Sequence, residues 1–220
     1  MTINVVTPWR DNAELIAAVF GELLPAAGLY TEGDPVFDPT YDKGLWWTRY
    51  TPTDFTQRGR VDEPTWDFRV MPYRDDTFAV AAYDPTYQAQ GGRETSTIDL
   101  SYGRADIPAR PADLLGMNIA GLVECLRVTT TVVMVKSMDF ITGGELHLHT
   151  RHLEDVAGML GWSVYERLVH QPSGGRPQPG GRAELHARQR HSTLSVLTPY
   201  KHRKGIVARR PVSTTTKKAR

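Results

Sequence analysis

Residues 77–87 read Thr-Phe-Ala-Val-Ala-Ala-Tyr-Asp-Pro-Thr-Tyr, and this stretch decides the fold. Its first seven residues are an apolar run with aromatic and β-branched members, which is typical of a buried strand. Asp84 and Pro85 then open a turn, and a Gly/Ser/Thr-rich segment follows from Gln88 to Gly103. Ligands of open α/β sheets bind at the carboxyl ends of strands. We therefore expect Asp84 to lie at a binding site, with an ordinary turn as the alternative.

Strands and helices alternate along the rest of the chain. A helix capped by Asp11 is expected to end near Pro25 and Gly28, and two more are expected over about 111–126 and 151–160. The predicted strands are 35–38, 47–55, 65–70, 78–83, 129–136, 162–170 and 192–197. This order predicts a three-layer α/β fold with a mostly parallel, seven-stranded sheet. The last two strands have no helix between them, so they are predicted to pair antiparallel at one edge.

Size and composition indicate one soluble domain. The chain has 220 residues, of which 40% are hydrophobic and 23% charged. We expect a single domain over 1–200 and a basic tail over 201–220. No apolar run is long enough to cross a bilayer, and Met1–Trp9 does not read as a signal peptide. The lone Cys125 offers neither a disulfide nor a thiolate cluster, so a reducing, cytoplasmic setting is expected.

Charge is distributed unevenly along the sequence. The tail from Lys201 onward holds eight basic residues and no acid, which leaves 18 basic against 25 acidic residues in the remaining chain, a net charge of −7 there. Basic arms bind phosphate backbones in a sequence-independent, salt-sensitive way. The alternative is a disordered, solubilising tail.

Asp84-Pro85-Thr86-Tyr87 resembles the (Asp/Asn/Ser)-Pro-Pro-(Tyr/Phe/Trp) motif of the S-adenosylmethionine-dependent amino-methyltransferases, which methylate the exocyclic nitrogen of adenine or cytosine. The likeness covers about 35–197 and is to small methylases common in actinobacteria and their phages, which implies a restriction–modification setting. Its further matches are Trp66-Asp67-Phe68-Arg69, Gly91-Gly92-Arg93-Glu94-Thr95-Ser96, Cys125-Leu126-Arg127, Val135-Lys136-Ser137-Met138-Asp139, His186-Ala187-Arg188 and His191-Ser192-Thr193-Leu194.

The resemblance implies a Rossmann-like methyltransferase fold, with DNA as partner and RNA as an open alternative. It also implies roles for the motif. Asp84 and the Pro85 carbonyl would accept hydrogen bonds from the exocyclic amine, which favours the form of the amine whose lone pair can attack. Tyr87 would stack on a base that has left the duplex.

A second Asp-Pro-Thr-Tyr, at residues 38–41, follows the first predicted strand, where such enzymes carry their cofactor loop. The resemblance assigns Asp38, Thr40 and Gly44 to S-adenosylmethionine. The family's first loop glycine is replaced by Asp42, which can tolerate left-handed backbone geometry. Two further acids are expected at the cofactor: Asp54, at the end of the second strand, for the ribose, and Asp67, with Phe68 beside it, for the adenine. Each of these acids could instead be a solvated surface residue, and the loop a simple turn.

Other polar clusters carry weaker signals. His147, His149 and His152 are expected to lie in a loop and a first helical turn, with no metal bound, because no carboxylate or thiolate recurs at matching spacing. Lys136 and Asp139 could line the cofactor crevice. Candidate contacts to nucleic acid are basic residues in loops and the tail: Arg93, Arg176, Arg182, Arg188, Lys201, Arg203 and Lys204.

Three functions follow as hypotheses. The first is methylation of adenine, or less favourably cytosine, in DNA. The second is a catalytically silent relative that binds nucleic acid or a protein partner, which Asp42 and the Thr86 in place of proline favour. The third is methylation of a protein glutamine or a small-molecule amine.

Overall fold

A six-stranded sheet forms the centre of the protein. The computed structural model describes residues 9–58, 66–87, 89, 108–171 and 191–201. In these residues the strand order is β2-β1-β3-β4-β8-β7. The strands are β1 (Val36–Asp38), β2 (Phe55–Gln57), β3 (Phe78–Tyr83), β4 (Thr129–Ser137), β7 (Trp162–His170) and β8 (Ser192–Pro199).

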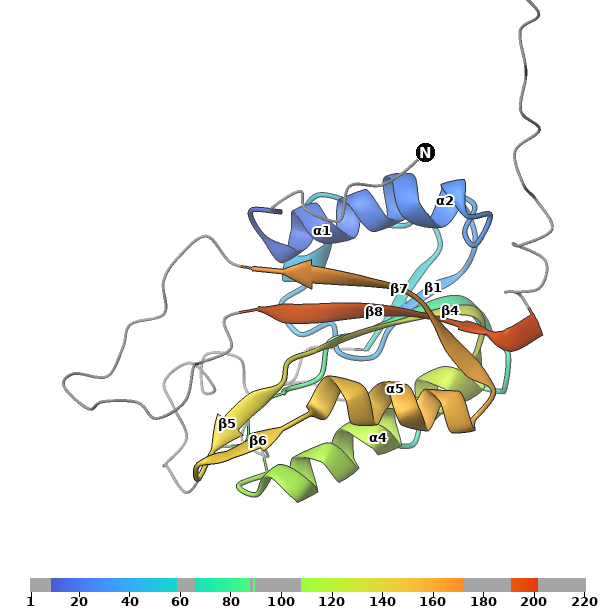
Figure 1. Ribbon diagram of the computed structural model, residues 1–220. Helices are drawn as coiled ribbons and strands as arrows, with labels where there is room; N and C mark the ends of the chain where they lie inside the picture. Colours follow the sequence, from blue (N-terminus) through green and yellow to red (C-terminus); the bar gives the residue numbers. More distant parts are fainter. Residues whose placement is uncertain (1–8, 59–65, 88, 90–107, 172–190, 202–220) are drawn as a thin grey trace, which may run out of the picture.

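Helices cover both faces of this sheet (Figure 1). One face carries α1 (Asn12–Ala18), the π-helical turn η1 (Val19–Leu23) and α2 (Leu24–Ala26), while α4 (Pro111–Val128) and α5 (His149–Met159) lie on the other. The predicted cap is present, since the Asp11 side chain accepts a hydrogen bond from the Glu14 amide at 2.8 Å. Each face holds its own hydrophobic cluster, so the sheet is buried on both sides.

The strand directions confirm the predicted fold class. β2, β1, β3 and β4 are parallel neighbours, whereas β8 pairs antiparallel with both β4 and β7. β7 is thus the edge strand of the expected antiparallel pair, and β8 is inserted between it and β4. This is a three-layer, Rossmann-like α/β fold. Within the described residues, no helix has the length and apolar character needed to cross a membrane.

Two predicted strands are wrong and one hairpin was not predicted. Residues 47–55 do not form a strand; η2 (Leu45–Trp47) is a 3₁₀ turn, and β2 begins only at Phe55. The described part of 65–70 forms turns. A separate hairpin follows β4, with β5 (Phe140–Thr142) and β6 (Glu145–His147) joined by Gly143 and Gly144, both at positive φ as a tight hairpin turn requires.

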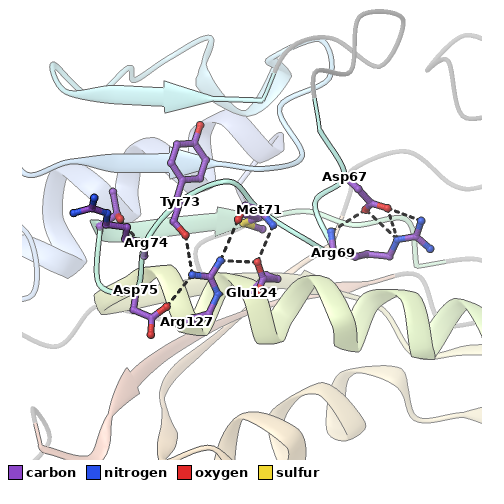
Figure 2. Close-up of polar contacts among 9 residues, drawn as sticks. Asp67, Arg69, Met71, Tyr73, Arg74, Asp75, Glu124 and Arg127 are labelled. Carbon is purple, nitrogen blue, oxygen red and sulfur yellow. Dashed lines mark hydrogen bonds and ion pairs between the residues drawn. The ribbon is translucent and has the colours of Figure 1, made fainter.

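A polar network at the end of α4 fixes the segment that leads into β3 (Figure 2). The Arg127 guanidinium donates to the carbonyls of Met71 and Tyr73, at 3.2 and 2.8 Å, and to the carboxylates of Asp75 and Glu124. Glu124 also accepts from the Met71 amide at 2.7 Å. One half-buried arginine therefore satisfies two loop carbonyls and holds 71–75 against α4.

Candidate active site

The candidate active site lies at the edge of the sheet where β1, β3 and β4 end. These strands are parallel neighbours, so their carboxyl ends meet at one edge. β1 ends at Asp38, and Asp84 directly follows β3. Tyr83 pairs with Val135, so the next residues in line are Asp84 and Lys136. Adjacent strands are about 5 Å apart, which brings both Asp-Pro-Thr-Tyr copies to the same place.

Thr40 joins the two copies directly. Its hydroxyl accepts a hydrogen bond from the Asp84 amide at 2.8 Å and donates to Asp38 Oδ1 at 3.1 Å. The Thr40 amide donates to the same Asp38 oxygen at 2.8 Å. The loop after β1 is thereby fastened to the loop after β3, at the first residue of the motif.

Asp38 is a buried acid whose hydrogen-bond partners are uncharged. It is only 3% exposed, and its Oδ2 accepts from Trp47 Nε1 at 2.7 Å. Burial raises the pKa of Asp38 to about 7, and the neighbouring Asp84 carboxylate adds to the rise, although the bonds from Trp47 and Thr40 oppose it. Asp38 therefore titrates near neutral pH, where the presence of a cation would decide its charge.

Lys136 supplies the positive charge of the cluster. Its ammonium is buried and lies 3.9 Å from Asp84 Oδ1. The same Nζ lies 5.6 Å from the centre of the Tyr87 ring and 5.8 Å from that of Trp46, within cation–π range of both. Lys136 thus offsets the charge of Asp84 and contacts the aromatic ring that ends the motif.

Tyr87 is only partly buried. It packs against a small hydrophobic cluster of Leu114, Met138 and Phe140. Its ring therefore has apolar contacts on the α4 and β5 side and the Lys136 ammonium nearby. Such support fixes the orientation of an aromatic side chain that is partly open to a ligand.

The opposite side of the motif is held by Asn118 of α4. Its Nδ2 donates to the Thr86 carbonyl at 2.7 Å and lies 2.9 Å from His149 Nε2. Its backbone carbonyl accepts from the Tyr83 hydroxyl at 3.2 Å. Burial lowers the pKa of His149 to about 4, so this imidazole is neutral at ordinary pH.

The loop after β1 contains two residues in the left-handed region of backbone geometry. Asp42 has φ 47° and Gly44 φ 67°, so Asp42 does adopt the left-handed geometry that its residue type can tolerate. A Cβ at Gly44 would meet the Tyr41 ring at 2.5 Å. Gly44 is therefore required by its own conformation and by the Tyr41 ring that lies over it.

Asp54 is not brought to this cluster. It precedes β2, and its carbonyl accepts from the Val36 amide at the opposite edge of the sheet. The expectation that Asp54 ends the second strand is wrong because that strand begins only at Phe55. Arg58 follows β2 instead, and its amide donates to the Asp38 carbonyl at 2.9 Å.

Asp67 is engaged by a neighbour rather than placed on a strand. Its carboxylate accepts from the Arg69 amide at 2.8 Å and from the Arg69 guanidinium at 2.6–3.0 Å (Figure 2). These bonds lower the pKa of Asp67. Phe68 lies near the Tyr83 ring and close to Gly121 of α4, so it contributes to packing beneath the motif. The roles of Asp67 and Phe68 at the cofactor stay predictions.

Most of the predicted contacts to nucleic acid lie outside the described residues, namely Arg93, Arg176, Arg182, Arg188, Arg203 and Lys204. Lys201 is described and exposed. It follows β8, which runs away from the cluster because it is antiparallel to β4. Eight residues of strand span about 25 Å, so Lys201 lies at the far edge of the sheet.

The histidines lie only partly where the sequence placed them. His149 begins α5 and His152 is exposed in the first turn of that helix, as predicted, whereas His147 ends the strand β6 and does not lie in a loop. In the part of the chain that the structure describes, no three His, Cys, Asp or Glu side chains are grouped as metal ligands would be.

Several residues of the site are not found by sequence reasoning. Sequence patterns place Trp47 on a strand. They assign no function at the site to Trp46 or Asn118. One signal is available, because Asn118 stands four residues from both Leu114 and Leu122 and so falls on the apolar face of its helix. His149 gives no comparable signal, since its partner is 31 residues away.

Comparisons with known proteins give likeness in structure only. No protein-family model and no curated protein sequence matches the chain. PH1948 from Pyrococcus horikoshii, described as a candidate RNA methyltransferase, is 12% identical with a TM-score of 0.41, over 85% of this chain and 82% of that one. PH0226 from Pyrococcus horikoshii OT3 is 11% identical with a TM-score of 0.38, over 89% of this chain and 93% of that one. A function has to come from the residues of this chain.

Proposed function

We propose that this protein transfers a methyl group from S-adenosylmethionine to the exocyclic amine of a nucleobase in DNA, adenine before cytosine. The observation that carries the proposal is the joining of Asp38, Thr40 and Asp84 at the carboxyl edge of the sheet, beside Lys136. In this fold the carboxyl edge is where a ligand binds. The sequence resemblance adds the reaction type.

The cluster suits a cationic cofactor. Asp38 and Asp84 contribute two carboxyl groups, and the ammonium of Lys136 lies near Asp84, whereas the hydrogen-bond partners of Asp38 are neutral. A sulfonium ion beside Asp38 would favour the ionised carboxylate and restore the balance of charge. Asp42 and Gly44 both have the left-handed backbone that is expected where the family's cofactor loop has its two glycines. The Tyr41 ring lies over Gly44. Bound S-adenosylmethionine would supply the electrophilic methyl group.

The residues of the chain would act on the acceptor base. Asp84 and the Pro85 carbonyl would accept hydrogen bonds from the amine, an interaction that strengthens as the nitrogen becomes pyramidal in the transition state. Tyr87 would stack on the flipped base, which offsets part of the few kcal/mol that unstacking costs. Lys136 would hold Asp84 and Tyr87 in place through the contacts described above.

Replacing Asp84 tests the proposal. Asp84→Ala should lower kcat for transfer of tritiated methyl groups to unmethylated DNA about 100-fold or more, the range seen when one group that stabilises a transition state is removed. Affinity for S-adenosylmethionine should change less than about threefold, because Asp84 is assigned to the base. Nucleoside analysis would identify the methylated base.

Asp155→Ala is the matched control, since this exposed acid on α5 forms an ion pair with Arg151 that solvent screens. Equal loss of transfer and of cofactor affinity in Asp84→Ala would mean that Asp84 is structural. Labelling of RNA, of a protein or of a small amine while DNA stays unlabelled would overturn the choice of DNA.

A silent relative is the second candidate. It is favoured by the charged Asp42 where the family has glycine and by the Tyr41 ring packed on Gly44. Both features restrict the approach of a cofactor to the loop. Calorimetric titration with S-adenosylmethionine separates the two candidates, because a silent protein should release no heat of binding.

A further inference from the structure

The contacts of Asn118 determine which way its side-chain amide faces. Its amide nitrogen lies 2.7 Å from the Thr86 carbonyl and 2.9 Å from His149 Nε2, and the residue is completely buried. A carbonyl can only accept, so the nitrogen rather than the oxygen of the Asn118 amide must face Thr86. The amide has two hydrogens, and its second one is directed to His149 Nε2.

The tautomer of His149 follows from this arrangement. Because Nε2 accepts from Asn118, the ring proton of the neutral imidazole must lie on Nδ1. A protonated His149 would present an N–H to the Asn118 N–H, and the bond would be lost. The charged groups that act on His149 are Asp139, which favours protonation, and His147 and His152, which oppose it; burial outweighs all three and keeps the pKa low.

His149 is itself held in place by β4 and the segment after it. The Thr150 amide donates to Asp139 Oδ1 at 2.8 Å, and the Ser137 hydroxyl donates to the Thr150 hydroxyl at 3.0 Å. The first turn of α5 is thus fastened to the end of β4. His149 precedes Thr150 in this turn, and its ring contacts Asn118, which bonds to the motif after β3.

We propose that Asn118 and His149 are positioning residues for the Asp84–Tyr87 motif. Asn118 holds the Thr86 carbonyl toward α4, and neutral His149, with its proton on Nδ1, orients the Asn118 amide. Together they set the direction of the motif backbone from which Asp84 and the Pro85 carbonyl meet the acceptor amine. The catalytic part of this inference rests on the proposed function, while the hydrogen-bond arrangement does not.

Nuclear magnetic resonance of the unmodified full chain tests the arrangement without any variant. The ring nitrogens of His149 should show the tautomer protonated on Nδ1 at pH 7, and the ring should titrate below about pH 5, because burial disfavours the imidazolium. A ring protonated on Nε2 at pH 7 would overturn the proposal, whatever reaction the protein catalyses.

Variants test the positioning role. Asn118→Ala should raise the hydrogen-exchange rate of the Asp84 amide at least about tenfold, and lower kcat about 10- to 100-fold, the cost of a displaced catalytic group. Affinity for S-adenosylmethionine should stay within about threefold of the unmodified protein. Asn118→Asp should raise the pKa of His149 above its ordinary value of about 6.5, because a carboxylate would face the ring.

His152→Gln is the matched control, since His152 lies on the same helix as His149 but is exposed. It should leave exchange, kcat and melting temperature unchanged. An Asn118→Ala protein that keeps both its exchange rate at Asp84 and its kcat within about twofold of the unmodified protein would refute the positioning role. If the unmodified protein methylates no acceptor, the proposed function fails, and the tautomer and the exchange rate still decide this inference.

Discussion

At the scale of single residues, the site is governed by the charge of Asp38. This carboxyl group is buried next to another acid, and its hydrogen-bond partners, Thr40 and Trp47, are neutral. Lys136 lies beside Asp84 instead. Asp38 therefore gains most when a cation binds near it, because the cation stabilises the ionised form that burial disfavours.

The affinity for S-adenosylmethionine should consequently depend on pH. Asp38 has a pKa of about 7 in the ligand-free protein, so a bound cation lowers this pKa and releases a proton at or below neutral pH. Affinity should then rise up to about fivefold between pH 6 and 7, and level off above about pH 8, where Asp38 is already ionised. Calorimetry in buffers of different ionisation enthalpy measures both the affinity and the protons released.

S-Adenosylhomocysteine is the control for this prediction. It has the same amino acid portion but an uncharged sulfur, so its affinity should vary less over the same pH range. An equal pH dependence of both ligands would show that the sulfonium does not lie near Asp38.

At the scale of elements, the contact of α4 with β3 positions the motif. Gly121 stands where the helix crosses Tyr83 and Phe68, and a Cβ there would meet Tyr83 Oη at 2.3 Å and the Phe68 ring at 2.6 Å. Tyr83 is fully buried and ends β3, one residue before Asp84. The helix can therefore approach the strand this closely only with glycine at position 121.

Gly121→Ala should destabilise the protein although alanine favours helices. Overpacking costs typically about 1–3 kcal/mol, which exceeds the gain of about 1 kcal/mol in helix propensity. Gly116→Ala on the same helix is the control: its Cβ meets nothing within 4 Å, so it should stabilise by up to about 1 kcal/mol. Urea unfolding of both variants measures the difference, and stabilisation by Gly121→Ala would contradict the packing described.

The elements that sequence patterns predict well are the longer strands rich in β-branched and aromatic residues. β3 is a continuous apolar run and β4 is mostly β-branched, and the predicted bounds of both agree closely with the observed ones. The strand expected at 47–55 failed because Trp47 is bound to Asp38 and turns the chain into a 3₁₀ segment. The strand expected at 65–70 failed because Asp67 bonds to the backbone two residues on, which favours a turn.

Sequence patterns predict only those residues of the candidate site that are placed by the end of their own strand. Asp38, Thr40 and Asp84 lie at or just after the ends of strands, and strand order alone brings them together. Asn118 and His149 bind across α4 and α5, so their meeting depends on how two helices pack on the sheet. Periodicity can show that Asn118 is buried, but it does not identify a partner 31 residues away.

At the scale of the whole molecule, we expect the acidic body and the basic tail to carry two different tasks. Lys201, where the tail begins, lies at the edge of the sheet opposite the cluster. Contacts between the tail and phosphates would then add affinity without touching the reacting base. Loss of the tail should therefore lower the affinity for DNA, whereas loss of a catalytic residue should lower kcat.

Deleting residues 201–220 should weaken binding to DNA and leave kcat at saturating DNA within about twofold. The slope of log affinity against log salt should become less steep by about 0.9 for each phosphate that the tail no longer neutralises. Replacing the eight basic residues of the tail by glutamine should have the same effect without shortening the chain. An unchanged salt slope in both proteins would show that the tail does not bind phosphate.

The insertion of β8 between β4 and β7 also constrains how the protein can be synthesised. β4 and β7 both form hydrogen bonds with β8. Neither β4 nor β7 can make these bonds until residues 192–199 have emerged from the ribosome. During translation the nascent chain would expose the unpaired edge of β4, which is an aggregation hazard. Premature termination before residue 192 should therefore yield a product that chaperones and proteases recognise, not a smaller folded protein.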